Sequence, residues 1–457
     1  MGALPAVPAD FLWGAATASY QVEGHPLADG ACPSNWHRFT HRRGKVQDGT
    51  NGDLACDHYH RFPEDIRHMK ELGLGAYRFS LAWPRVVPEP GRLNPRGLAF
   101  YDRLVDGLLE AGIRPFATLF HWDLPAWLED RGGFVRREAL EHLDFYAEAV
   151  FRALGDRVGH WLTINEPMIY AFFGYVFGHF PPGLHWRLRP AFAAAHHLLL
   201  GHARLVRLYR ALTPTGGERA PGAALPAGSL GGIGISNHLL HLRPLRPENP
   251  RDLRAARRVE AVVNRFFLDP LYFGRYPAEA LQRVARYLPR GWEQDLPEMR
   301  EPGDFLGLNY YSAQSYRHAP LAPVLGAVEV PTPGARRSAM WEIAPQGLGA
   351  LLRLLQTEYG NPPVYITENG YPLPERPGAD PLEDGERIEY LAAHIDAALQ
   401  ARGQGADLRG FFVWSLLDNF EWHLGNTMRF GLIRVDFANL QRSWRASAHW
   451  YRELIRR

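Results

Sequence analysis

Short segments that are almost continuously apolar recur along the chain, and most are followed by a polar loop and a stretch of helical periodicity. Segments that are apolar on both faces are typical of strands buried on both sides of a parallel sheet. Eight can be distinguished, at residues 11–16, 76–82, 114–121, 161–165, 233–237, 305–311, 364–368 and 411–415.

Apolar residues spaced three and four positions apart predict helices between these segments. The clearest cover residues 100–111, 138–154, 190–212, 251–267, 347–359 and 386–402. Eight strands alternating with helices predict an α/β fold, a (β/α)8 TIM barrel with long loops over the carboxyl-terminal face. A doubly wound open sheet is the alternative, but the turn after residues 11–16 lacks the glycine-rich pattern that a dinucleotide-binding sheet would place there.

The length of 457 residues suggests three domains at about 150 residues each, but a barrel with inserted loops can exceed about 400 residues as one unit. Two stretches could pass for linkers. Residues 213–232 precede the fifth strand and are expected on the amino-terminal face, whereas residues 319–334 follow the sixth and are expected over the carboxyl-terminal face. Neither separates two independent cores, so we expect one domain spanning residues 1–457.

Composition and charge exclude several classes of binding partner and of catalytic chemistry. Hydrophobic residues make up 46% and charged residues 22%, which supports a large core. The 51 basic and 49 acidic residues leave a net charge of +2, which gives no electrostatic support for a nucleic-acid partner. Lys45 and Lys70 are the only lysines, so a Schiff-base or P-loop lysine has few candidates. Aromatic residues reach 12%, a surplus that suggests a use beyond the core.

The number of cysteines and the absence of long apolar runs indicate the cellular compartment in which the protein is expected. Cys32 and Cys56 are too few for a disulfide framework, which favours a reducing environment. Residues 1–11 lack the basic start and apolar stretch of a signal peptide. No apolar run approaches the roughly 18 residues of a membrane span. We therefore expect a soluble cytoplasmic protein without a membrane partner, while the oligomeric state stays open.

Polar and aromatic residues follow most of the predicted strands. In a barrel the carboxyl ends of the strands meet at one rim. Amides, an imidazole, indoles and carboxylates together suit a sugar, because polar groups bind its hydroxyls and aromatic faces cover its apolar side. These rim residues are Gln21, His121, Trp122, Asn165, Glu166, Asn309, Tyr310, Tyr311, Glu368, Asn369, Trp414, Glu421 and Trp422.

Two of these residues, Glu166 and Glu368, are expected to face one another at the ends of the fourth and seventh strands. Glycoside cleavage uses such a pair, one carboxyl donating a proton to the leaving oxygen and the other attacking the anomeric carbon or activating water. A separation of about 5–5.5 Å retains the anomeric configuration and one of about 6.5–9.5 Å inverts it. The spacing in sequence leaves both outcomes open.

Segments 163–167 (TINEP) and 366–370 (ITENG) resemble the two catalytic signatures of glycoside hydrolase family 1, the β-glucosidase family. The resemblance extends from about residue 10 to residue 450, in family order. The further matching blocks are residues 11–24 (FLWGAATASYQVEG), 77–80 (YRFS), 121–125 (HWDLP), 308–311 (LNYY) and 413–422 (VWSLLDNFEW).

This resemblance implies a retaining β-glucosidase in which Glu166 is the acid/base and Glu368 the nucleophile. It implies that Arg78 and Tyr311 steady Glu368, and a nearby guanidinium lowers the pKa of a carboxylate. Asn165 would bind the sugar 2-hydroxyl. The other substrate-binding residues that it implies are Gln21, His121, Trp122, Asn309, Tyr311, Glu421 and Trp422, with Trp414 as a stacking floor and Trp341 and Phe430 completing the set.

The resemblance also bears on the substrate. Glutamate at 166, where the related thioglucosidases carry glutamine, favours O-glycosides, and Glu421, where 6-phospho-glycosidases carry serine, favours an unphosphorylated sugar. The implied substrates are cellobiose, cello-oligosaccharides and aryl β-glucosides, with side activity on β-galactosides and β-fucosides. Departures from the family pattern at Phe134, Met168, His423 and Asn426 leave the aglycone preference open. A transglycosylase, a non-catalytic sugar-binding barrel and a metal-dependent barrel hydrolase are the alternatives.

No cofactor or metal is implied. The pattern Asp57-His58-Tyr59-His60 and the pair His196-His197 do not show the i, i+4 spacing of a helical zinc pair, so we expect structural roles for them. The arginine-rich run at 251–258 has helical spacing and is expected to be a solvated face.

Overall fold

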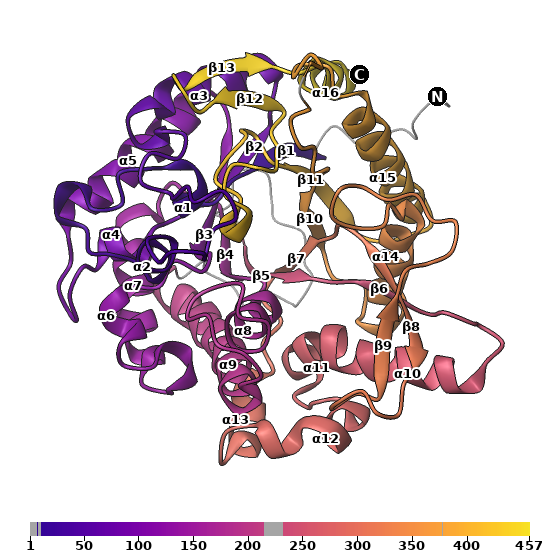
Figure 1. Ribbon diagram of the computed structural model, residues 1–457. Helices are drawn as coiled ribbons and strands as arrows, with labels where there is room; N and C mark the ends of the chain where they lie inside the picture. Colours follow the sequence, from indigo (N-terminus) through magenta and orange to yellow (C-terminus); the bar gives the residue numbers. More distant parts are fainter. Residues whose placement is uncertain (1–6, 8–10, 214–231, 377) are drawn as a thin grey trace.

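The eight apolar segments form the barrel that the sequence predicts. The computed structural model describes residues 7, 11–213, 232–376 and 378–457 (Figure 1). Eight parallel strands close in the order β1-β11-β10-β7-β5-β4-β3-β2, so that β1 pairs with both β2 and β11. They are β1 (Leu12–Ala16), β2 (Ala76–Ser80), β3 (Arg114–Phe120), β4 (His160–Asn165), β5 (Ile233–His238), β7 (Phe305–Asn309), β10 (Val364–Asn369) and β11 (Leu408–Trp414).

Aromatic side chains fill the barrel near the amino ends of its strands. The ring of Phe116 lies 4.8 Å from that of Phe412 and 5.3 Å from that of Tyr365, between ring centroids. Phe305 lies 5.2 Å from Tyr365 in the same layer. A Cβ at Gly14 would lie 2.5 Å from the Phe412 ring, so this layer requires glycine there. Part of the aromatic surplus therefore fills the interior of the barrel at the amino ends of its strands.

Helices surround the strands as an outer ring (Figure 1). All the predicted helices are present, and residues 251–267 continue through a π-helical turn, Ala261–Arg265, into α11. Helix α3, between β1 and β2, and helix α16, after β13, were not predicted. The long helices are α3 (His58–Leu72), α5 (Pro95–Glu110), α7 (Ala139–Leu154), α9 (Leu188–Leu212), α10 (Pro250–Glu260), α14 (Pro345–Glu358), α15 (Gly385–Gly403) and α16 (Ala446–Ile455).

Shorter elements lie in the connections. The helices are α1 (Ser19–Val22), α2 (Asn35–Thr40), α4 (Trp83–Val86), α6 (Ala126–Glu129), α8 (Pro167–Tyr175), α11 (Phe266–Phe273), α12 (Ala278–Val284) and α13 (Trp292–Met299), with 3-10 turns at Ala28–Gly30, Gly133–Val135, Ala285–Tyr287 and Trp422–Leu424. The strands are β6 (His241–Pro244), β8 (Ala313–His318) and β9 (Ala327–Val330) in one small sheet, and β12 (Ile433–Asp436) and β13 (Gln441–Trp444) in another.

The two linker-like stretches have different outcomes. Nearly all of residues 213–232 lies outside the described residues, so its expected position stays a prediction. Residues 319–334 follow β8 and include β9, which returns antiparallel to β8. Arg258 donates hydrogen bonds to the carbonyl oxygens of Leu325 and Gly326 at 2.7 and 3.0 Å. The arginine-rich run is therefore only partly a solvated face, because Arg258 holds this loop.

Other expectations concern cysteines, histidines and membranes. Cys32 and Cys56 are both free. His58 contacts Asp65 at 2.7 Å, and His196 contacts Asp295 at 2.9 Å, so both are buried and paired within the fold. Most of residues 1–11 lies outside the described part of the chain. Among the described residues, no helix combines the length and apolar character needed to cross a bilayer.

Candidate active site

The site forms where the carboxyl ends of the barrel strands meet, and its centre is the carboxylate of Glu368 on β10. Arg78, fully buried on β2, places Nη1 2.5 Å from Oε1 of Glu368. The hydroxyl of Tyr311 donates to Oε2 at 2.7 Å. Both carboxylate oxygens are thus held, one by a guanidinium and one by a phenol, although the residues come from three different strand ends.

The second carboxylate, Glu166, directly follows β4 and is 5% exposed. Asn309, at the end of β7, donates to its Oε1 at 2.7 Å. The same amide nitrogen lies 3.1 Å from Oδ1 of Asn165, which also accepts a 2.6 Å hydrogen bond from Arg78. A continuous polar network therefore joins the surroundings of Glu166 to those of Glu368 through Asn165 and Arg78.

His121 has a defined tautomer in this network. The side-chain amide of Asn165 donates to Nε2 of His121 at 2.9 Å, so the ring proton lies on Nδ1. This Nδ1 is buried and has no partner in the structure. Burial, together with the charge of Arg78, holds the pKa of His121 well below its ordinary value. A neutral imidazole with an unused donor suits the hydroxyl of an uncharged ligand.

Burial dominates the electrostatics of the carboxylates. It raises the pKa of Glu368 to about 7, with Arg78 acting in the opposite direction and the charge of Glu166 adding to the rise. The predicted effect of Arg78 has the right sign, but burial outweighs it. Burial and the charge of Glu368 likewise raise the pKa of Glu421 to about 8. Crowding of carboxyl groups in a water-poor site thus makes ionisation of each one harder.

Gln21 and Glu421 form the far side of the site. The amide nitrogen of Gln21 donates to the side chain of Asn419 and the carbonyl of Phe420, both at 3.0 Å, and lies 3.3 Å from Oε2 of Glu421. Its own carbonyl oxygen, Oε1, is buried without a partner in the structure. The segments that follow the first and last strands of the barrel are therefore hydrogen-bonded to one another through Gln21, and Oε1 of Gln21 can still accept a hydrogen bond from a ligand.

Indole rings surround the same space. Trp414 and Trp422 lie 6.0 and 6.1 Å from the ring of His121, in both cases with the rings nearly parallel. Trp122 lies 4.9 Å from Trp422 and donates its Nε1 to the carbonyl of Asn165 at 2.8 Å. The three tryptophans that were predicted to line the sugar site at the strand ends, Trp122, Trp414 and Trp422, therefore lie together around His121.

Three rim residues have a strained backbone. Trp122, Glu166 and Trp422 adopt φ angles of 80°, 45° and 52°, in a region that residues other than glycine rarely occupy. Such conformations cost about 1–3 kcal/mol each and persist where the surroundings fix them. A Cβ at Gly370 would lie 1.8 Å from the carbonyl oxygen of Trp414, so the carboxyl ends of β10 and β11 approach as closely as glycine allows.

A second aromatic group lies beside Glu368. Tyr311 is 5.0 Å from Trp341, and Phe430 is 6.0 Å from Trp341 and 6.5 Å from Tyr311. Trp341 and Phe430, which sequence reasoning placed in the substrate site, thus connect to Glu368 through Tyr311. Phe134 does not belong here. It is fully buried against Phe120, so its departure from the family pattern concerns core packing.

Sequence reasoning missed His238, the last residue of β5. Its Nδ1 lies 3.4 Å from Oε1 of Glu166, and its ring stacks on Tyr311 at 6.1 Å. The signal was available, because a histidine at the end of a barrel strand points to the rim. It also missed Trp36 on α2, whose ring lies 4.4 Å from that of Trp422.

Comparison with known proteins agrees with this geometry. The family model described as glycosyl hydrolase family 1 matches residues 5–457. The chain belongs to glycosyl hydrolase family 1. Among family 1 relatives it is 43% identical to beta-glucosidase A of Thermotoga maritima, over 98% of this chain and 97% of the relative. It is 40% identical to beta-glucosidase A of Acetivibrio thermocellus, over 98% of both chains.

Solved structures of the family show the same architecture. The family 1 β-glucosidase from Thermotoga maritima superposes with a TM-score of 0.91 at 42% identity, over 99% of this chain and 98% of that one. A second structure from that organism, complexed with a cyclophellitol analogue described as a transition-state mimic, gives a TM-score of 0.92 at 43% identity, with 98% of each chain covered. The family assignment and the TIM barrel are thereby confirmed.

Proposed function

We propose that this family 1 enzyme hydrolyses terminal β-D-glucosyl residues by a retaining double displacement. Glu368 is the nucleophile and Glu166 the acid/base. The observation that carries the assignment is the unequal anchoring of the two carboxylates. Glu368 has one oxygen on Arg78 and the other on Tyr311. Glu166 is held through a single oxygen by the neutral amide of Asn309. Arg78 and Tyr311 fix both oxygens of Glu368 and act against the effect of burial on its pKa, whereas Glu166 has an oxygen that Asn309 does not hold and that can face the leaving group.

The first half of the reaction forms a covalent intermediate. The carboxylate of Glu368 attacks the anomeric carbon while Glu166 donates its proton to the leaving oxygen, so the glycosidic bond breaks as an ester bond forms. The second half reverses the roles. Glu166, now ionised, takes a proton from a water molecule, which attacks the anomeric carbon and releases Glu368.

Recognition of the glucosyl unit is assigned to the groups with unused hydrogen-bonding capacity. The Nδ1 proton of His121 and the Oε1 acceptor of Gln21 are buried and have no partner in the structure. Glu421, at the same wall, would take hydroxyls of the sugar. Trp414 provides the stacking surface, and Trp122 and Trp422 complete the wall. The contacts of Trp122 and Trp414 with His121, and of Trp122 with Trp422, support this assignment.

The aglycone is assigned to the group formed by Tyr311, Trp341 and Phe430, because Tyr311 donates to Glu368 and the other two rings pack around it. Support for the substrate class comes from relatives named beta-glucosidase and 1,4-beta-D-glucan glucohydrolase, the latter from Thermotoga neapolitana and 42% identical over 98% of both chains. Cellobiose, cello-oligosaccharides and aryl β-glucosides are the proposed substrates, with side activity on β-galactosides and β-fucosides. No step requires a metal or an organic cofactor.

The chain is further proposed to act as one catalytic unit. The family model spans residues 5–457, which supports a single domain. Two free cysteines fit a reducing compartment such as the cytoplasm.

The decisive experiment is covalent trapping. A 2-fluoro β-glucoside slows both steps but leaves the first feasible, so the sugar accumulates on the nucleophile. Peptide mass mapping is expected to find one sugar per chain on the peptide that contains Glu368. Label on a peptide without Glu368 would overturn the nucleophile assignment. Absence of label together with undetectable hydrolysis would favour a sugar-binding barrel. Analysis of the products at high cellobiose concentration separates hydrolysis from transglycosylation.

A further inference from the structure

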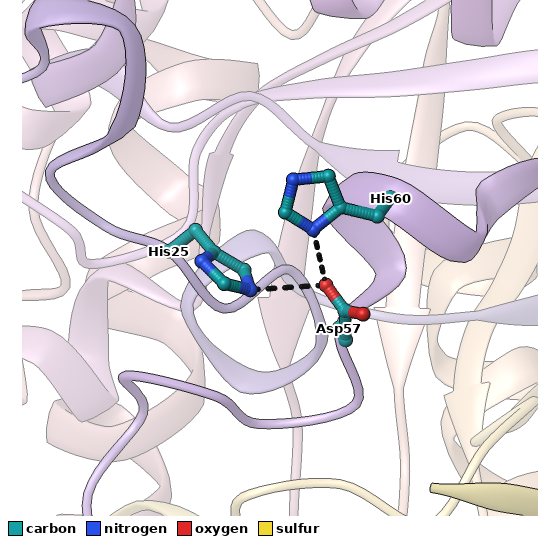
Figure 2. A group of neighbouring side chains, drawn as sticks. All are labelled: His25, Asp57 and His60. Atoms are coloured by element: carbon teal, nitrogen blue, oxygen red, sulfur yellow. Dashed lines mark hydrogen bonds and ion pairs between the residues drawn. The ribbon is translucent and has the colours of Figure 1, made fainter.

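A cluster of two imidazoles and a carboxylate lies outside the active site, where the two ends of the loop between β1 and α3 meet. Figure 2 shows His25, from the start of this loop, and His60, from the first turn of α3, both directed at Asp57. Nε2 of His25 lies 3.1 Å and Nδ1 of His60 lies 2.6 Å from Oδ1 of Asp57. The two imidazole rings are 4.4 Å apart.

These separations are close to those of a metal site. Zinc binds histidine nitrogen and carboxylate oxygen at about 2.0–2.2 Å in tetrahedral geometry, which sets neighbouring ligand atoms about 3.3–3.4 Å apart. The His25–Asp57 contact is nearly that long, the His60–Asp57 contact is about 0.7 Å shorter than it, and the three ligand atoms all lie within 4.8 Å of one another, so the His60 ring must turn outward to admit an ion. The His60 side chain is 57% exposed, so it has room to do so. The exposed side leaves a fourth position for water.

The backbone beneath the cluster is held in place. The amide of His25 donates to the carbonyl of Asp53 at 2.7 Å, and that of Asp57 donates to the carbonyl of Leu54 at 2.8 Å. Arg85, buried against Glu23, also donates to the carbonyl of His25 at 3.3 Å. Two of the three ligand residues are therefore placed by the fold before any ion binds, which reduces the cost of assembling a site.

We propose that His25, Asp57 and His60 bind one divalent transition-metal ion of the zinc class. With neutral imidazoles the three groups carry a net charge of −1, and nitrogen and oxygen donors in this number suit zinc. The ion connects the two ends of the loop that carries α2, and Trp36 on α2 contacts Trp422 of the active site. The ion is thus a structural clamp behind one wall of the site and takes no part in the chemistry.

A neighbouring group provides an internal comparison. His37 and His41 contact the two different oxygens of Asp53, at 3.1 and 3.0 Å. Their donor atoms therefore do not converge on one oxygen.

Binding of Zn²⁺ to the metal-free full-length protein is measured by titration calorimetry at about pH 7.5, where unperturbed imidazoles are neutral. The expected result is saturable binding in which His25→Asn and His60→Asn each remove one equivalent or weaken it at least tenfold. His41→Asn leaves that equivalent in place. Co²⁺ bound to the unaltered protein shows visible absorption typical of a low-coordinate site, and this absorption is lost in the same two variants.

Absence of saturable Zn²⁺ binding would overturn the proposal, as would binding that is unchanged in either His25→Asn or His60→Asn. Activity toward an aryl β-glucoside in zinc-free buffer confirms that each variant is folded, because neither histidine belongs to the catalytic site. If a variant loses activity, its Zn²⁺ binding is compared with that of His25→Gln or His60→Gln, which keeps more of the side chain.

Discussion

Replacement of Tyr311 by phenylalanine tests the proposed role of Glu368 as the nucleophile. Tyr311→Phe removes the hydroxyl that donates to Oε2 of Glu368 at 2.7 Å but keeps the ring beside Trp341. That hydrogen bond lowers the pKa of Glu368 against burial, which raises it to about 7. A hydrogen bond to a charged group contributes roughly 1.5–3 kcal/mol, and one pKa unit corresponds to about 1.4 kcal/mol. The pKa of Glu368 should therefore rise by about one to two units.

The rate should follow this pKa, because only the ionised nucleophile attacks. Activity is lost as the pH falls through the pKa of Glu368, so the acidic limb of the profile should move to higher pH in Tyr311→Phe. Well below that limb, the variant should be a further 10–100-fold slower, by the same conversion. The assay is kcat/KM for an aryl β-glucoside against pH, which reports on ionisations of the free enzyme.

The neighbouring Tyr310 offers a matched control. Its hydroxyl donates to the carbonyl of Ala344 at 2.6 Å and does not contact a carboxylate. Tyr310→Phe should leave the acidic limb in place, even where it lowers stability. An unmoved limb in Tyr311→Phe would refute the reasoning, and so would an equal shift in both variants.

Three further predictions concern stability and reactivity. Asp418→Ala leaves buried Arg445 without the carboxylate that accepts two 2.8 Å hydrogen bonds from it, and should lower the free energy of unfolding by about 3–5 kcal/mol in urea titrations. Gly370→Ala forces a Cβ to 1.8 Å from a carbonyl oxygen of β11, and should abolish activity or soluble expression. Burial raises the pKa of both thiols, that of Cys32 to about 12 and that of Cys56 further, so neither should react rapidly with a thiol reagent at about pH 8 until the chain is unfolded.

The first two of these predictions have matched controls. Glu89→Ala breaks an exposed pair with Arg92 and should change the free energy of unfolding by at most about 1 kcal/mol. Gly385→Ala meets no atom within 4 Å and should stay active. A loss at Asp418 no larger than at Glu89 would contradict the first prediction, and an active, stable Gly370→Ala would contradict the second. Fast labelling of the native protein would contradict the third.

Hydrophobic pattern was enough for the barrel because its strands are buried on both faces, and each predicted segment overlaps an observed one. Helix α3 was not predicted because it contains many polar residues and because Pro63 interrupts the helical spacing of its apolar residues. Strands β6, β8 and β9 were also missed, because they lie in a small partly exposed sheet without a continuous apolar run.

The predicted site residues do come together, but their surroundings were beyond reach from the chain alone. Motifs placed Glu368 beside Arg78 and suggested a lowered pKa. The opposite direction follows from burial, which depends on how the barrel closes around the carboxyl. His238 contacts Glu166 only because β5 and β4 are neighbours, and His25 meets His60 only because the loop between β1 and α3 folds back. Contacts of this kind carry no local pattern.

The hydrogen bond from Gln21 to Asn419 joins residues 398 positions apart. A chain is synthesised from its amino end. Gln21 therefore leaves the ribosome long before Asn419, its hydrogen-bond partner, has been added to the chain. The rim that we propose binds the sugar is therefore one of the last features to form during synthesis. A stalled or truncated chain would have most of the barrel and yet no complete site, so incomplete products of translation should contribute no uncontrolled glycosidase activity to the cell.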